Sequence, residues 1–180
     1  MLKKVLIIVA VIILVFVGYL AYSGFFASVN ITEGDAGPYK FIGKEYVGDY
    51  RFSGEHQDSI YKDLTARGLE LTEGFGIYRD NPDEVAAENL RSMVGRVLPE
   101  KYNDRIPELE REGYIIQDMG KTKSVIVAFP FRNSLSILAS VLKVYPKLNV
   151  YFTEKGYEDV PSLEIYTKDE IIISMEIIKE

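Results

Sequence analysis

One sequence motif occurs twice in this chain, 88 residues apart. TARGLELTEGFGIY begins at Thr65, and TEKGYEDVPSLEIY begins at Thr153. Each copy has a basic residue followed by Gly, a common way to end a helix, and each closes on Ile-Tyr, which suits a strand. Leu64 and Phe152, apolar residues just before the two copies, keep the same offset. A chance match is the alternative, because a helix end with a basic residue and Gly is common and Ile-Tyr suits any strand. The shared spacing and apolar register favour a duplicated structural unit.

The hydrophobic periodicity predicts the same element order in both halves, strand–helix–strand–strand. The expected elements are strands at 39–50, 75–79 and 90–98 around a helix at 54–67, a short helix at 103–111, strands at 114–118 and 123–131, a helix from 134 to 155 with a kink or restart at Pro146, and strands at 162–167 and 171–177. The repeats span about 39–98 and 114–180. Two such units side by side predict an α+β fold with a mostly antiparallel sheet.

The N-terminus predicts a membrane anchor. Residues 5–26 are almost entirely apolar, and as a helix they reach about 33 Å, enough to cross a bilayer core of about 30 Å. A cleaved signal peptide is the alternative, but its apolar region is usually shorter. Lys3 and Lys4 favour a cytoplasmic N-terminus, with the domain outside the cytoplasm. The expected organisation is a transmembrane anchor at 1–27, a linker at 28–38 and one domain at 39–180, held in the membrane as a single-pass protein.

Composition narrows the chemistry. The chain has no Cys and a single His, His56, which leaves little room for thiolate chemistry, a His-rich metal site or a Ser-His pair. No catalytic residue, metal or cofactor is therefore predicted. All 27 acidic residues lie after residue 32, with all but two of the 21 basic residues. Because phosphate neutralisation needs Lys and Arg, this acidic domain is expected to have no nucleic-acid partner.

Glu164 and Tyr166 are the leading candidates for a ligand site. They lie two residues apart on a predicted strand, so their side chains share one face. Gly76 and Tyr78 are their equivalents in the first repeat, and Tyr50, which ends the first strand-like segment, is the fourth candidate ligand-binding residue with Glu164, Tyr166 and Tyr78. If the repeats face each other, Gly76 leaves space opposite Glu164 and an acidic pocket with two tyrosines results. The alternative places Glu164 on a solvated strand face.

The chain contains GPY at 37–39, YRDNP at 78–82 and PSLEIY at 161–166. These stretches resemble the gyrase-inhibitor-like (GyrI-like) family of effector-binding domains. Longer stretches, among them FPFRNSLSILASVLKVYPKLNVYFTEKG at 129–156, are similar to a membrane-anchored branch of that family, to which an animal testis-expressed ER-phagy receptor belongs. The resemblance implies a tandem strand–helix–strand–strand fold with a ligand groove between its halves.

These observations predict a membrane-anchored, non-enzymatic module that binds or senses a small cationic or amphipathic molecule. Its lipid contact is expected through residues 5–26. One alternative is a protein-interaction or scaffold domain that presents itself to a protein partner at the membrane. The other is a small-molecule hydrolase that uses Glu164, which has little support because a single carboxylate lacks a partner base.

Overall fold

Two copies of one unit build a single antiparallel sheet in the computed structural model, which describes residues 2–179. The eight strands lie in the order β1-β6-β8-β7-β3-β4-β2-β5. Their bounds are β1 Thr32–Ala36, β2 Tyr39–Val47, β3 Gly74–Tyr78, β4 Arg91–Val97, β5 Ile115–Met119, β6 Thr122–Pro130, β7 Ser162–Tyr166 and β8 Glu170–Glu176. The α-helices are α1 Leu2–Tyr22, α2 Ser53–Ala66, α3 Ile106–Arg111 and α4 Ser134–Lys155, with short 3-10 helices at Tyr50–Phe52, Ala87–Asn89 and Glu100–Arg105.

The predicted duplication is present in the order of the elements. The first unit is β2-α2-β3-β4 and the second is β6-α4-β7-β8. The two units meet where β3 pairs antiparallel with β7, and the register places Gly76 directly opposite Glu164. On either side of that pair, Gly74 lies opposite Tyr166 and Tyr78 lies opposite Ser162. The Gly76–Glu164 pair is therefore the centre of the pseudo-two-fold relation between the units, as the 88-residue offset predicts.

The predicted linker at 28–38 is wrong in part, because strand β1 lies inside it. β1 pairs with β6, with Thr32 opposite Ile126, while β5 pairs with β2. Each unit thus lends its leading strand to the other unit. The sequence of β1, TEGDA, is polar because β1 is an edge strand with mostly exposed side chains, so it lacks the alternation that marks a half-buried strand.

One face of the sheet carries helices α2 and α4. A row of directly paired residues crosses this face, from Val127 on β6 through Ile173, Glu164 and Gly76 to Val94 on β4. α4 packs over β6 and β8 at one end of the row, and α2 packs over β2 and β4 at the other end. The centre of the row, at β3 and β7, lies between the helices.

The opposite face has its own core. Phe41, Phe75, Met93, Leu163 and Ile165 are all buried there, and the rings of Phe41 and Phe75 stack at 4.4 Å between centroids. Partly buried side chains of the sheet itself pack against this core, namely Tyr39, Ile77, Val97, Met119 and Ile172. The face of β3 and β7 that points away from the helices is thus packed, which fixes the strands that hold Glu164.

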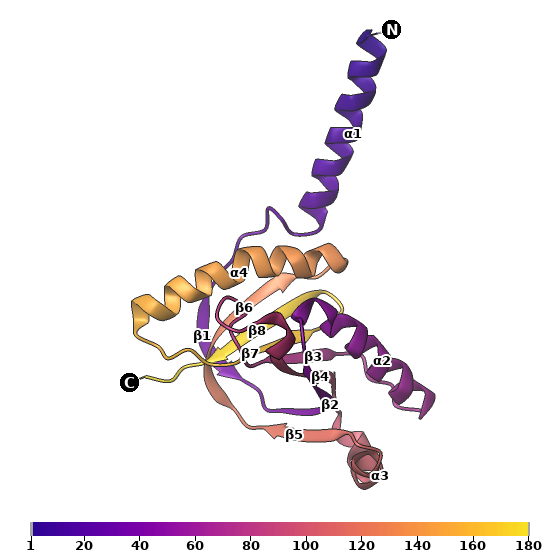
Figure 1. The fold of residues 1–180 in the computed structure, drawn as a ribbon, viewed down its shortest axis with the longest axis vertical. Coiled ribbons are helices and arrows are strands. Elements are labelled where there is room, and N and C mark those ends of the chain that lie inside the picture. The colour runs from indigo at the N-terminus through magenta and orange to yellow at the C-terminus, as the bar shows by residue number, and fades with distance from the viewer. Residues whose placement is uncertain (1, 180) are drawn as a thin grey trace.

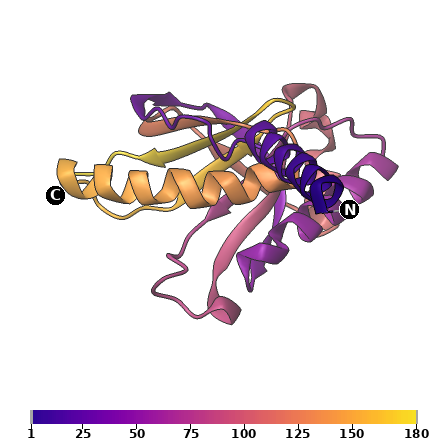
Figure 2. The ribbon, with the colours of Figure 1, turned by 90° about the horizontal axis from the view of Figure 1, so that it is seen from above.

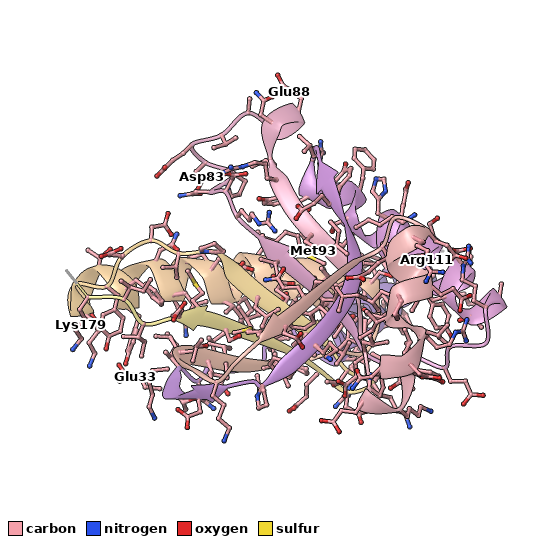
Figure 3. The ribbon with its side chains drawn as sticks, turned by 90° about the horizontal axis from the view of Figure 1, so that it is seen from below. Glu33, Asp83, Glu88, Met93, Arg111 and Lys179 are labelled. Carbon is pink, nitrogen blue, oxygen red and sulfur yellow. The ribbon has the colours of Figure 1, made fainter. Side chains whose placement is uncertain are left out.

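Helix α4 is capped at both ends. Asn133 accepts a hydrogen bond from the Leu135 amide and forms a capping box with Ser136, and the helix stops at Gly156, whose φ of 65° suits glycine. It continues through Pro146, so the restart expected there does not occur. Glu33 of β1 accepts hydrogen bonds from two tyrosines at the far end of α4, Tyr151 and Tyr157. Figure 3 shows Glu33 at the same end of the domain as Lys179.

Helix α1 projects from the α4 side of the domain (Figures 1 and 2). It is the one helix within residues 2–179 that is long and apolar enough to cross a membrane, and a signal sequence at this position passes the same test. It ends at Tyr22, before the expected limit at Phe26, because Ser23 is buried in the domain and Gly24 turns with φ of 94°. The Asn133 amide donates to Ser23 Oγ at 3.0 Å, and Lys143 Nζ donates to the Phe25 carbonyl at 2.7 Å. The base of α1 is therefore fastened to α4.

Candidate functional site

A cleft of about 1680 Å³ lies between α2 and α4 over the centre of the sheet. All four residues predicted from the sequence line it: Tyr50, Tyr78, Glu164 and Tyr166. Its α4 wall is apolar, with Leu138, Val141 and Leu142 exposed toward it. The α2 wall is polar and includes Gln57 and Asp58. The cleft thus joins an apolar side to a polar side, as a site for an amphipathic small molecule would.

Glu164 is the buried acid of this cleft. Its exposed fraction is 3%, so the alternative that placed Glu164 on a solvated strand face is wrong. The hydroxyls of Tyr145 and Tyr166 donate hydrogen bonds to Oε1 and Oε2 respectively. Among residues 2–179, no ion pair includes Glu164. The carboxyl group therefore has two neutral donors and no cation.

Gly76 does not leave open space opposite Glu164, and this part of the prediction is wrong. The ring of Tyr78 bends back along its own strand and covers Gly76. A Cβ at Gly76 would lie 2.7 Å from Tyr78 Cε2 and 2.8 Å from its Cζ and Oη. The missing side chain makes room for a tyrosine of the same strand, and the hydroxyl of that tyrosine lies against Tyr166 of the other unit.

The tyrosine hydroxyls form a continuous chain of hydrogen bonds. Ser53 Oγ at the start of α2 lies 3.1 Å from Tyr78 Oη, which lies 3.1 Å from Tyr166 Oη, and Tyr166 donates to Glu164. On the other side, Tyr145 Oη lies 3.0 Å from Ser162 Oγ and donates to Glu164. Two tyrosines of the second unit therefore bind the carboxyl group directly, and Ser53 and Tyr78 of the first unit join the network through Tyr166.

Burial dominates the electrostatics of this group. It raises the pKa of Glu164, and the hydrogen bonds from Tyr145 and Tyr166 oppose that rise because they stabilise the charged form. Burial, with the nearby Glu164 charge, also raises the pKa values of Tyr78, Tyr145 and Tyr166. These tyrosines therefore stay neutral and act as hydrogen-bond donors.

Tyr50 contributes through its ring and not through a free hydroxyl. Its ring meets that of Tyr78 edge-on at 4.8 Å between centroids. Its hydroxyl accepts from the Asp80 amide at 3.0 Å and donates to the Arg91 carbonyl at 2.9 Å. Asp80 in turn accepts from the Arg91 amide and guanidinium. Tyr50 thus fixes the loop after β3 and supports Tyr78.

The sequence reasoning missed two cleft residues, Tyr145 and Arg96. Tyr145 lies on α4 and donates directly to Glu164, but on a helix with many apolar positions a tyrosine carries no distinguishing signal. Arg96 lies on β4, in a stretch that reads as a plain strand. Within the described residues 2–179, no group of three or more His, Asp or Glu side chains is placed to hold a metal ion.

Known structures share this fold. The crystal structure of the EcmrR C-terminal domain matches with a TM-score of 0.60 and 17% identity, over 84% of this chain and 99% of that chain. An integron cassette protein from the mobile metagenome of Vibrio cholerae matches with a TM-score of 0.52 and 11% identity, over 84% of this chain and 97% of that chain. No protein-family model and no curated protein sequence matches the chain. At these identities the similarities show a shared fold, and they carry no information on a membrane-anchored branch.

The expectation of no nucleic-acid partner is wrong as an inference from charge. EcmrR in a cryo-EM complex with DNA matches with a TM-score of 0.61 and 18% identity, over 99% of this chain and 69% of that chain. A protein that contains this fold can therefore be part of a complex with DNA. Net charge is a property summed over a whole domain, so it does not decide what a protein containing that domain contacts.

Proposed function

We propose that this chain is a membrane-anchored module that binds a small cationic or amphipathic molecule in the cleft between α2 and α4. The observation that carries the proposal is Glu164, a buried carboxyl group with no cation beside it among residues 2–179. A buried acid without a counter-ion is costly in a fold, and such groups gather at functional sites. A cationic ligand would offset that cost.

The tyrosines show how a cation would be held. The hydroxyls of Tyr145 and Tyr166 donate hydrogen bonds to Glu164, which increases the electron density of their rings. A cation against these rings gains both cation–π attraction and attraction to the carboxylate behind them. The exposed side chains of Leu138, Val141 and Leu142 would cover the apolar part of the same ligand.

The proposal contains no catalytic step. Glu164 is engaged by two tyrosine hydroxyls, whose raised pKa values make them poor bases at neutral pH. The hydrolase alternative therefore has no specific observation in its favour. The membrane anchor rests on the length and apolar character of α1, which at about 1.5 Å per residue spans about 30 Å, the thickness of a bilayer core.

Hexyltrimethylammonium is a suitable probe, because it joins a cation to a short apolar chain. Calorimetry on the full chain in a non-ionic detergent would compare wild type with Glu164→Gln and with Glu88→Gln. Glu88 is exposed, lies outside the cleft lining and projects with Asp83 from the loop before β4, so the control removes the same charge at a distance (Figure 3). We expect Glu164→Gln to weaken binding about tenfold, the scale of one charge-assisted contact, and Glu88→Gln to leave it unchanged. Equal affinities in all three proteins would contradict the proposal.

A further inference from the structure

We propose that Arg96 forms a second subsite in the same cleft, which binds an acidic oxygen group of the ligand, such as a carboxylate or a phosphate. The inference rests on the proposed function and makes it narrower. A ligand that meets both the Glu164 region and Arg96 carries a positive group at one end and a negative group at the other. The expected ligand class is therefore a zwitterionic amphiphile.

Arg96 is held on the floor of the cleft beside the tyrosine cluster. It pairs with Gly74 on β3, and Gly74 pairs with Tyr166 on β7, so these residues share one face of the sheet. A Cβ at Gly74 would lie 3.2 Å from Arg96 Nη1 and 2.9 Å from Gln57 Oε1. The absence of a side chain at Gly74 thus leaves room for the guanidinium to lie over β3 and toward the cleft.

Among the residues that the structure describes, the guanidinium of Arg96 has no acidic partner, unlike those of Arg79 and Arg91 in the same unit. Its Nε is buried and has no hydrogen-bond partner, the one such side-chain atom among residues 2–179. Arg79 makes two hydrogen bonds to Glu45, and Arg91 binds Asp80 with its Nη2 at 2.6 Å. None of the ion pairs within residues 2–179 includes Arg96.

Two neighbours hold Arg96 without satisfying it. The ring of Tyr61 lies 4.5 Å from the guanidinium carbon, which orients the planar group by stacking. The charge of Asp58 attracts the guanidinium from the rim of the cleft, but no ion pair forms between them. An oriented, partly desolvated guanidinium with a free donor is the arrangement that binds a planar carboxylate or a phosphate with two parallel hydrogen bonds.

The spacing allows one small molecule to reach both ends. Strand β3 alone separates β4 from β7, so the backbones that carry Arg96 and Glu164 lie about 10 Å apart across the sheet. Both side chains extend from the same face and both line the cleft. The exposed leucines of α4 lie along the same cavity, which leaves the apolar chain of the ligand on the α4 wall.

The test compares hexyltrimethylammonium with hexylphosphocholine, which keeps the trimethylammonium group and the hexyl chain and places a phosphate and a two-carbon link between them. Calorimetry on the full chain would use wild type, Arg96→Met and Arg111→Met. Arg111 is exposed at the end of α3 and outside the cleft, so it controls for the loss of one positive charge. We expect wild type and Arg111→Met to bind hexylphosphocholine about tenfold more tightly than hexyltrimethylammonium, and Arg96→Met to lose this preference.

The outcomes separate the two proposals. Equal binding of the two compounds by wild type, with the loss of hexyltrimethylammonium binding in Glu164→Gln, would overturn the Arg96 subsite and leave the proposed function standing. Binding of neither compound to wild type would overturn both. Thermal unfolding of Arg96→Met supplies a second readout, because a guanidinium with an unpaired Nε contributes little to stability. A loss of several degrees, with both compounds weakened equally, would show that Arg96 is structural and would refute the subsite.

Discussion

Replacing Gly76 with Ala tests the geometry at the centre of the fold. The new Cβ would lie 2.7 Å from Tyr78 Cε2 and 2.8 Å from Cζ and Oη, closer than real Cβ contacts occur. The methyl group cannot move because Gly76 is paired on both sides, to Glu164 and to Val94. The ring of Tyr78 must therefore leave, and its hydroxyl must give up Ser53 and Tyr166.

The expected cost follows from these contacts. Forcing an extra methyl into a packed site costs about 1–3 kcal/mol, and the lost hydrogen bonds add about 1 kcal/mol. Gly76→Ala should therefore lower the free energy of unfolding by about 2–4 kcal/mol, measured by urea denaturation. For a domain of this size, the melting temperature should fall by about 5–15 °C.

Gly120→Ala is the matched control, because a Cβ at Gly120 meets no atom within 4 Å. We expect it to change the free energy of unfolding by less than about 0.5 kcal/mol. A double-mutant cycle with Tyr78→Ala identifies the cause. Once the ring is gone, Gly76→Ala should cost almost nothing. If Gly76→Ala costs the same with and without Tyr78, or matches Gly120→Ala, then the ring of Tyr78 does not occupy the space over Gly76.

Three further results are expected. Burial raises the pKa of Glu164 above its ordinary 4.5, so the folded state holds the Glu164 proton more tightly than the unfolded state. The free energy of unfolding of wild type, relative to Glu164→Gln, should therefore fall as pH rises from 4.5 to 8, by about 1.4 kcal/mol for each unit by which the pKa is raised. Urea denaturation at the two pH values tests this, and a constant difference between the two proteins would contradict it. Asn133→Ala removes the N-cap of α4 and the hydrogen bond to Ser23. It should lower the free energy of unfolding by about 1–2 kcal/mol and speed proteolysis at residues 23–27. An unchanged cleavage rate would mean that Asn133 does not hold this junction. The full chain should stay in the membrane fraction after a carbonate wash, and recovery of a mature form that begins near Ser23 would contradict the anchor.

Most of what could be predicted from the sequence came from the repeated motif at 65–78 and 153–166. A fixed offset of equivalent residues predicts two equivalent units, and a two-fold relation between units brings equivalent residues together at its axis. The strand–helix–strand–strand order and the Gly76–Glu164 pair follow from that reasoning, and both are present. Strand β1 was not predicted because its residues are polar and show no alternation. Its place in the sheet depends on pairing with β6 of the other unit, which its own sequence does not indicate.

The site was predictable only in its backbone. Strand alternation places Glu164 and Tyr166 on one face, but side-chain rotamers and helix positions lie outside what a periodicity can specify. The ring of Tyr78 turns back over Gly76, and Tyr145 reaches Glu164 from a helix nineteen residues earlier in the sequence. Arg96 was invisible for the same reason, since its exposure to the cleft depends on Gly74 in a neighbouring strand.

The axis of the duplication explains why the two copies must differ where they meet. Residues directly opposite each other on antiparallel strands have Cβ atoms about 5 Å apart. A carboxylate at both positions would bury two like charges side by side, and a tyrosine ring could then cover neither. With Gly76 in one copy, the ring of Tyr78 fits over the glycine and its hydroxyl lies within hydrogen-bond distance of the Tyr166 hydroxyl. Both copies can keep their tyrosine because Tyr78 and Tyr166 each lie two residues beyond the Gly76–Glu164 pair. Glu164 thus accepts directly from Tyr145 and Tyr166 of its own unit, and Tyr78 of the first unit joins this network through Tyr166. A single acid at the axis leaves one buried carboxyl group there instead of two.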